Sequence, residues 1–297
     1  MKMIYPPRLE KGGTIGIAAP CSAPNTEKLG NAISAFEQMG YKVKLSEHIY
    51  STADGYAGSL SERVDDLNSL LRDEGVNAVM LGGGDVGNEL LPYIDYNAVV
   101  KTPKPVISYS NGTYILNAIT SKTGVITYHG QTPRTYYETV PYNVASFNAH
   151  ITSGGIPSHE KAADWLCFGK SVSAQGKLVG GYLGHIAMML GGSYFEYSRN
   201  EKYILFLEDH HWFSVPETVA SYLAHIGQSG FLSGCECVIF GHYGEDQSDV
   251  CRVLERFSAQ YGISVIKCDD FGHGTYNAVF PIGANARIED SQALYYI

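Results

Sequence analysis

The stretch Pro105-Val-Ile-Ser-Tyr-Ser-Asn-Gly-Thr-Tyr-Ile-Leu-Asn-Ala-Ile119 joins a predicted strand directly to a predicted helix. Residues 105–109 form an apolar run typical of a buried strand, and residues 113–119 begin a predicted amphipathic helix. The connection Tyr109–Gly112 leaves no room for a relaxed loop. A side chain on such a sharp turn projects beyond the strand end, where the first N–H groups of the helix also point.

Two interpretations fit this turn. Ser110 could be a nucleophile, because N–H groups on the same turn can bind the oxyanion that develops during attack on a carbonyl. Alternatively, Ser110 or Asn111 could simply cap the helix, which is a common role for both residue types. The turn alone favours the cap, so the choice depends on the rest of the chain.

The composition describes a folded chain of one large or two modest domains. The sequence has 297 residues, 44% of them hydrophobic and 17% charged, which is enough apolar material for a packed core. The formal net charge is −9 and no basic run is present. A nucleic-acid partner is therefore not expected, because its phosphates require a cationic face.

Cellular location is predicted from features that the sequence does not contain. Residues 1–7 include no apolar signal-peptide core, and no apolar run is long enough to cross a membrane. The six cysteines do not have the spacing of a zinc site. We therefore expect buried, reduced thiols in a cytoplasmic protein.

Strands and helices alternate through residues 1–135, which predicts an N-terminal domain built on a doubly wound parallel sheet. In such sheets ligands bind beyond the carboxyl ends of the strands, where Gly82–Gly87 and Ser110 both lie. Residues 136–175 are rich in Ser, Gly, His and Asn and predict a linker. Regular patterns resume in a C-terminal domain over residues 176–297.

Glu208 and His273 are candidates to act with the serine. Glu208 follows the predicted strand 203–207, and His273 lies between two glycines in a predicted loop. Each residue alone is more simply a surface residue. Together with Ser110 they make up a Ser–His–Glu relay, in which the histidine moves the proton and the carboxylate orients the histidine.

Seven blocks, in order along the chain, resemble the LD-carboxypeptidase family of serine peptidases, which includes muropeptide LD-carboxypeptidases and microcin C self-immunity peptidases. The blocks cover residues 6–20, 83–95, 104–111, 123–130, 176–183, 204–209 and 271–274. The resemblance implies an α/β fold with a flavodoxin-like parallel-sheet N-terminal domain and a smaller β-rich α/β C-terminal domain. It also implies a homodimer and no cofactor or metal.

The resemblance further implies roles for individual residues. Ser110 would be the nucleophile, His273 the general base and Glu208 its partner, with an oxyanion hole formed by the N–H groups of Asn111 and Gly84. The implied reaction is hydrolysis of an amide next to a free C-terminal carboxylate. The implied substrate is a small peptide, the murein tetrapeptide, cleaved at the L,D bond to its terminal D-alanine.

Some positions differ from the family pattern and leave the substrate open. Asn111 stands where Asp is usual, Asp85-Val86 differs from the usual glycine turn, and His242 replaces a common arginine. We expect three further residues to bind substrate. These are Asp85 in the glycine turn, Arg134 for the substrate carboxylate, and Trp212 as an aromatic clamp for the base of a peptidyl-nucleotide, the substrate of a microcin C-type immunity peptidase.

Two other functions compete with the hydrolase. Glu208, Asp209, His210 and His211 could bind a metal, but adjacent residues at a strand end point to opposite sides and cannot all converge on one ion. A non-enzymatic ligand-binding module on the same scaffold is the second alternative, because a fold does not fix a function.

Overall fold

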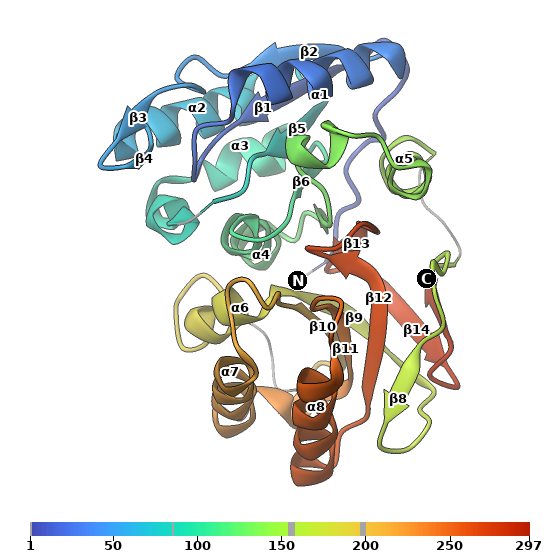
Figure 1. Cartoon of the computed structure of the whole chain (residues 1–297). Coiled ribbons are helices and arrows are strands. Elements are labelled where there is room, and N and C mark those ends of the chain that lie inside the picture. The colour runs from blue at the N-terminus through green and yellow to red at the C-terminus, as the bar shows by residue number, and fades with distance from the viewer. Residues whose placement is uncertain (1, 85, 154–157, 197–199) are drawn as a thin grey trace.

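The chain forms two lobes, each built around one β-sheet (Figure 1). The computed structural model describes residues 2–84, 86–153, 158–196 and 200–297. One continuous cluster of buried apolar side chains extends from the N-terminal lobe into the C-terminal sheet. The lobes therefore share a packed core, which places residues from both sheets in fixed positions at their boundary.

The N-terminal sheet has the strand order β13-β7-β6-β5-β1-β2 and is parallel except for β13. Its strands are β1 (Thr14–Ala18), β2 (Lys42–Leu45), β5 (Ala78–Leu81), β6 (Val106–Ser108), β7 (Thr127–His129) and β13 (Phe280–Ile282). Every residue of β5 and β6 is buried, as expected for strands covered on both faces. The predicted parallel sheet is confirmed.

Helices cover both faces of this sheet. The α-helices are α1 (Thr26–Gln38), α2 (Leu60–Arg72), α3 (Tyr96–Lys101) and α4 (Gly112–Thr123), with short 3₁₀ helices η1 (Gly87–Tyr93) and η2 (Pro133–Tyr136) and a small hairpin of β3 (Thr52–Ala53) and β4 (Tyr56–Ala57). The Asn25 side chain caps α1 by accepting a hydrogen bond from Lys28 N at 2.9 Å. Gly40, with φ of 86°, follows the end of α1.

Helix α4 lies between the two sheets (Figure 1). It packs against β6 and β7 of the N-terminal sheet and against β9 (Ala174–Tyr182) of the C-terminal sheet. Nearly all of its residues are buried, so the predicted amphipathic pattern is wrong here. The physical reason is that α4 has a sheet on either side and no face left for water.

The C-terminal sheet has the order β15-β14-β9-β10-β11-β12-β8 and mixes parallel and antiparallel pairs. Its other strands are β8 (Leu166–Phe168), β10 (Tyr203–Glu208), β11 (Cys235–His242), β12 (Val265–Gly272), β14 (Asn285–Glu289) and β15 (Ala293–Tyr296). Its helices are α6 (Leu183–Met189), α7 (Pro216–Gln228), the short 3₁₀ helix η4 (Phe231–Gly234) and α8 (Ser248–Tyr261). The predicted β-rich second sheet is confirmed.

Residues 136–175 contain more regular structure than the predicted linker. They include α5 (Pro141–Phe147), the π-helical turn η3 (Asn148–Thr152) and strand β8, which pairs with β12. These elements are too short to produce a clear periodicity in the sequence. In addition, β13 belongs to the C-terminal half of the chain but joins the N-terminal sheet, so the domain boundaries at residues 135 and 176 stay a prediction.

Two expectations about the whole molecule can be compared with the structure. Across the described ranges, no helix is both long and apolar enough to cross a membrane. All six cysteines are free thiols, but only Cys21, Cys237 and Cys268 are buried; the other three are partly exposed. The prediction of uniformly buried thiols is therefore half right, and the cytoplasmic location stays a prediction.

Candidate active site

The turn that carries Ser110 has the sharp geometry expected from the sequence. Strand β6 ends at Ser108, α4 begins at Gly112, and Ser110 has φ of 56°, in the left-handed region. Gly112 N and Thr113 N donate hydrogen bonds within the turn, to the carbonyl oxygens of Tyr109 at 3.1 Å and Ser110 at 3.0 Å. A Cβ atom on Gly112 would lie 2.1 Å from Ser108 Oγ, so this tight turn requires glycine there.

Asn111 does not cap α4 with its side chain but ties the serine turn to the glycine loop. It is 1% exposed, and its Oδ1 accepts hydrogen bonds from Gly87 N at 2.5 Å and Cys21 Sγ at 3.2 Å. The alternative that Asn111 is simply a helix cap is therefore wrong. Its side chain instead fixes the distance between two loops that face the same cavity.

The glycine loop lies beside the serine turn, at the end of β5. Gly82, Gly83 and Gly84 all line a cavity with Ser110. Gly84 has φ of 131°, and a Cβ atom there would lie 2.2 Å from Ser22 Oγ, so only glycine brings this backbone to the cavity. Val86 also has a positive φ, 59°, which is unusual for a β-branched residue. Asp85, the substrate-binding candidate, lies outside the described residues.

Glu208 and His273 come together from different strands of the C-terminal sheet. Glu208 is the last residue of β10 and is fully buried, and His273 directly follows β12. His273 Nδ1 donates a hydrogen bond to Glu208 Oε2 at 2.7 Å. Burial raises the pKa of Glu208, but the charge and hydrogen bond of His273 outweigh this effect and leave the pKa below its usual value. The carboxylate is therefore ionised, and because Nδ1 donates to it, Nε2 is the ring nitrogen that is available to accept a proton.

Aromatic rings and a second histidine hold these groups in place. The ring centroid of His273 lies 4.9 Å from that of Tyr109 and 5.6 Å from that of Tyr182. From the C-terminal lobe, His185 Nδ1 donates to the Ser110 carbonyl oxygen at 3.2 Å. Ser110 and His273 line the same cavity, although no hydrogen bond joins their side chains within the described part of the chain. In unliganded enzymes this contact is often long and tightens when substrate binds.

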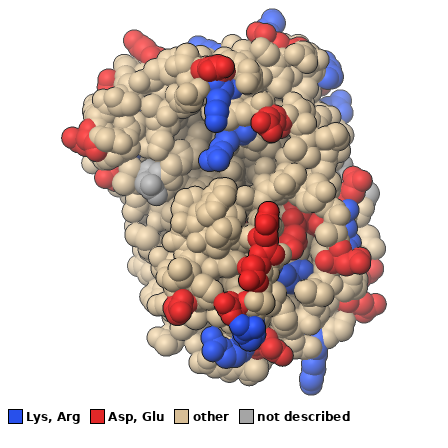
Figure 2. All heavy atoms as spheres, viewed as in Figure 1, with Lys and Arg blue, Asp and Glu red and all other residues tan. Residues whose placement is uncertain are grey.

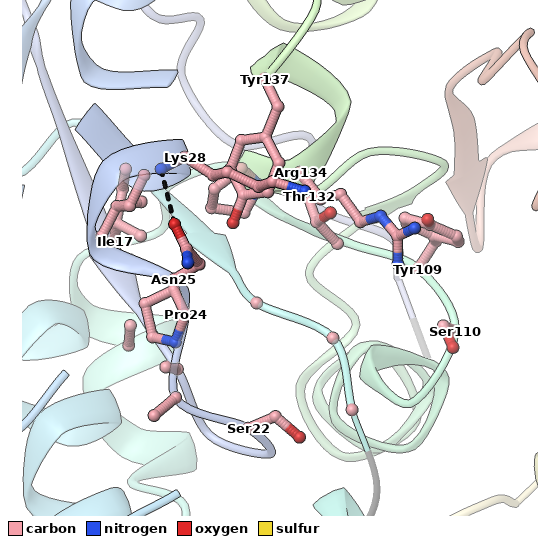
Figure 3. Close-up of a pocket in the computed structure, with 18 of the residues that line it drawn as sticks. Ile17, Ser22, Pro24, Asn25, Lys28, Tyr109, Ser110, Thr132, Arg134 and Tyr137 are labelled. Atoms are coloured by element: carbon pink, nitrogen blue, oxygen red, sulfur yellow. Dashed lines mark hydrogen bonds between the residues drawn. The ribbon is translucent and has the colours of Figure 1, made fainter. Parts of the chain in front are cut away.

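The cavity at the lobe boundary has a volume of about 600 Å³. Among the described residues, Lys28 and Arg134 are the only Lys or Arg residues that line it, and no Asp or Glu does so. Figure 3 shows the Arg134 guanidinium extending toward Tyr109 and the serine turn. Figure 2 shows basic side chains above the hollow between the lobes and acidic ones on the lower lobe. The cavity is therefore suited to an anionic ligand.

The two halves of the chain match two family models. The model of the LD-carboxypeptidase N-terminal domain matches residues 15–130, and that of the C-terminal domain matches residues 175–288. The chain belongs to the LD-carboxypeptidase family. It is therefore an enzyme, and the alternative of a non-enzymatic binding module is wrong.

Comparisons with individual members of the LD-carboxypeptidase family support this assignment. It is 29% identical to the probable murein peptide carboxypeptidase of Bacillus subtilis (strain 168), covering 97% of this chain and 92% of the relative. It is similar to the crystal structure of an MccF-like protein from Bacillus anthracis, with a TM-score of 0.90, 26% identity and 99% of each chain covered. The microcin C7 self-immunity protein MccF in complex with aspartyl sulfamoyl adenosine has a TM-score of 0.88 and 22% identity, covering 99% of this chain and 98% of that one, which shows the shared fold alone.

Trp212, the residue that was expected to form an aromatic clamp in this LD-carboxypeptidase-family protein, is not among the residues that line the cavity. Trp212 is 67% exposed and packs against the His210 ring at 4.4 Å between centroids. The next residue, Phe213, lines the cavity instead, with its ring 5.2 Å from that of His273. Strand alternation stops at Glu208, so the direction of side chains in the following turn could not be read from the sequence.

The four residues of the metal alternative do not converge. Glu208 faces His273, and Asp209 Oδ1 accepts hydrogen bonds from the Tyr182 hydroxyl at 2.7 Å and from His210 N at 2.8 Å. His211 Nδ1 instead donates to the Tyr243 carbonyl oxygen at 3.2 Å. In the parts of the chain that the structure describes, the only group of three metal-type ligands is formed by His159, Cys268 and Asp270. The side chains of 208–211 therefore do not form a metal site.

Proposed function

We propose that this protein is a metal-independent serine carboxypeptidase that cleaves an amide next to a free C-terminal carboxylate. Ser110 is the nucleophile, His273 the general base and Glu208 the residue that orients it. The observation that carries the proposal is the 2.7 Å hydrogen bond between His273 and buried Glu208, at a cavity that Ser110 also lines. This contact distinguishes the pair from an isolated surface histidine and a solvated carboxylate, which would not be hydrogen-bonded to each other at a cavity.

The chemistry follows from the order of these groups. His273 Nε2 takes the Ser110 Oγ proton as Oγ attacks the carbonyl carbon, and Glu208 stabilises the imidazolium that forms. The N–H groups of Asn111 and Gly84 bind the developing oxyanion. His273 then protonates the leaving amine, and the C–N bond breaks. Water, activated by the same imidazole, hydrolyses the acyl-enzyme and regenerates the Ser110 hydroxyl.

Arg134 binds the terminal carboxylate of the substrate in this proposal. A guanidinium matches a carboxylate with two parallel hydrogen bonds, and Arg134 lines the cavity with its guanidinium extending toward Tyr109. Lys28 adds a second positive charge on the same wall. The substrate that fits best is a murein tetrapeptide ending in D-alanine, cleaved at the L,D bond.

A peptidyl-nucleotide is the second candidate substrate, as in a microcin C-type immunity peptidase. It is supported by the similarity in fold to MccF, whose solved structure is a complex with aspartyl sulfamoyl adenosine. Phe213 also supports it, because this cavity residue is 61% exposed and offers a ring on which a base can stack. Lys28 and Arg134 would then face the phosphate.

The test is to incubate the protein with a tetrapeptide ending in D-alanine and, separately, with a peptidyl-aminoacyl-adenylate mimic, and to identify products by mass spectrometry. Ser110→Ala and His273→Ala should each lower kcat/KM by about 10⁴-fold or more, and to a similar degree, because relay members act as a unit. The exposed histidine His225 on α7 provides the control variant His225→Ala, which should keep full activity. Near-normal activity of His273→Ala would show that the base is wrongly assigned.

EDTA treatment addresses the metal alternative directly. The relay needs no metal, so activity should be unchanged after incubation with EDTA and gel filtration. Loss of activity that zinc restores would contradict the proposed mechanism.

A further inference from the structure

A second histidine, His129, faces the carboxylate of Glu208 from the opposite lobe. It is the last residue of β7 and is 0% exposed. Its Nε2 lies 3.9 Å from Glu208 Oε1, the oxygen that His273 does not use. In the described part of the chain, neither ring nitrogen of His129 nor Glu208 Oε1 has a hydrogen-bond partner. The two groups without partners therefore face each other.

The surroundings of His129 are otherwise apolar. The rings of Phe206 and Phe271 lie 5.3 Å and 6.5 Å from its ring, and the ring of Tyr109 lies 6.4 Å away and perpendicular to it. A polar atom that is buried without a partner destabilises the folded protein, whereas a phenylalanine would fill this space without that penalty. Packing alone therefore does not explain an imidazole at this position, and Glu208 Oε1 is the polar atom that lies near it.

The protonation state of His129 suits a neutral donor. Burial lowers the pKa of His129 to about 4; the negative charge of Glu208 opposes this effect, and the charge of His273 reinforces it. At neutral pH the ring therefore carries one N–H and no charge. A neutral donor can hold a carboxylate without neutralising its charge, which His273 needs when it becomes an imidazolium.

We infer that His129 is a positioning residue that directs its Nε2–H at Glu208 Oε1 and so keeps Oε2 on His273 Nδ1. This inference rests on the proposed function. His129 pairs with Ser108 in the sheet register, two residues before the nucleophile, and Glu208 ends a strand of the other sheet. The contact thus sets the base relative to the nucleophile across the lobe boundary. At 3.9 Å this contact is electrostatic rather than a hydrogen bond.

The kinetic test uses His129→Phe, which keeps the ring volume and removes the donor, and His129→Gln, which retains an N–H. Without the donor, the Glu208–His273 pair binds a proton more readily. The acid limb of the kcat/KM profile of His129→Phe should therefore move up by about half to one pH unit, and kcat should fall about tenfold with KM unchanged. His129→Gln should restore most of both.

The control is His150→Phe, at a second buried histidine, which packs against Tyr296 rather than the relay. It should leave the acid limb where it is. Suppose that the wild type is active and Ser110→Ala is inactive. If His129→Phe then keeps the acid limb and kcat of the wild type, the role of His129 is overturned and the proposed function stands. Loss of wild-type cleavage, or activity in Ser110→Ala, would instead contradict the proposed function.

A measurement on the wild type keeps the inference testable if the variants do not fold. Nitrogen-15 NMR of histidine-labelled protein distinguishes the two neutral imidazole tautomers. The inference requires the His129 proton on Nε2, facing Glu208. A proton on Nδ1 would place a lone pair against the carboxylate and would overturn it.

Discussion

Ser110 occupies a backbone conformation that a non-glycine residue adopts at a cost, and this cost can be measured. Its φ of 56° lies in the left-handed region, which is about 1–2 kcal/mol less favourable for a residue with a Cβ atom. Ser110→Ala and Ser110→Gly both remove the hydroxyl and should both be inactive. They differ in stability because only glycine relieves the strain of the turn.

The magnitude follows from two opposing terms. At an ordinary position, a protein with glycine is about 0.5–1 kcal/mol less stable than the same protein with alanine, because glycine gives the unfolded chain more conformational freedom. At Ser110 the relieved strain is larger than this loss. Ser110→Gly should therefore be as stable as Ser110→Ala or up to ~1.5 kcal/mol more stable, measured as the free energy of unfolding in urea.

The matched control is Ser34, an exposed residue within α1. There, Ser34→Gly should be less stable than Ser34→Ala by about 1 kcal/mol, the usual order in a helix. If Ser110→Gly were also about 1 kcal/mol less stable than Ser110→Ala, the serine turn would not be strained and the reasoning would be refuted.

Three further outcomes are expected. Arg134→Ala should raise KM about 10–100-fold for a peptide with a free C-terminal carboxylate and should leave KM for the amidated peptide unchanged, as measured by initial rates. Equal effects on the two peptides would show that Arg134 does not bind the carboxylate. Gly181→Ala should lower the free energy of unfolding in urea by about 3 kcal/mol, because Gly181 has φ of 144° and the new Cβ would lie 2.5 Å from Thr113 Oγ1. The control is Gly30→Ala in α1, where no atom lies within 4 Å of the new Cβ, and it should be neutral or stabilising. Burial, with a smaller contribution from the charge of His159, lowers the pKa of His150 to about 3. The unfolded chain therefore binds a proton first, and up to ~5 kcal/mol of stability is lost as the pH falls from about 6.5 toward 3. Urea unfolding of His150→Gln should show a smaller loss over that window, and an identical pH dependence would contradict the assignment.

Local signals in the sequence predicted the positions of the main candidates well. The short strand followed by Gly112 and a helical pattern placed Ser110 on a sharp turn, and the apolar run before Glu208 placed this carboxylate at a strand end. Both inferences depend on neighbouring residues only. The combination of a serine turn, a strand-end glutamate and a glycine-flanked histidine suggested that His273 belongs with them, and the resemblance to known blocks supported this, although 65 residues separate His273 from Glu208.

Contacts between lobes were not predictable from the same signals. Helix α4 was expected to have a solvent face because its sequence does not record that a second sheet covers it. Phe213 enters the cavity through an irregular turn, and His129 meets Glu208 only because two strands from different sheets end at one place. These features depend on tertiary packing, which overrides local pattern.

Strand β13 has a consequence for how this protein is made. Phe280 pairs with His129, so the outer edge of the N-terminal sheet receives its final strand from a segment that is synthesised long after β7. While the ribosome is still synthesising the protein, β7 has an open edge, and open edges invite pairing with other chains. Truncated products that lack residues 280–282 should therefore aggregate, and the enzyme should gain activity only after these residues have emerged.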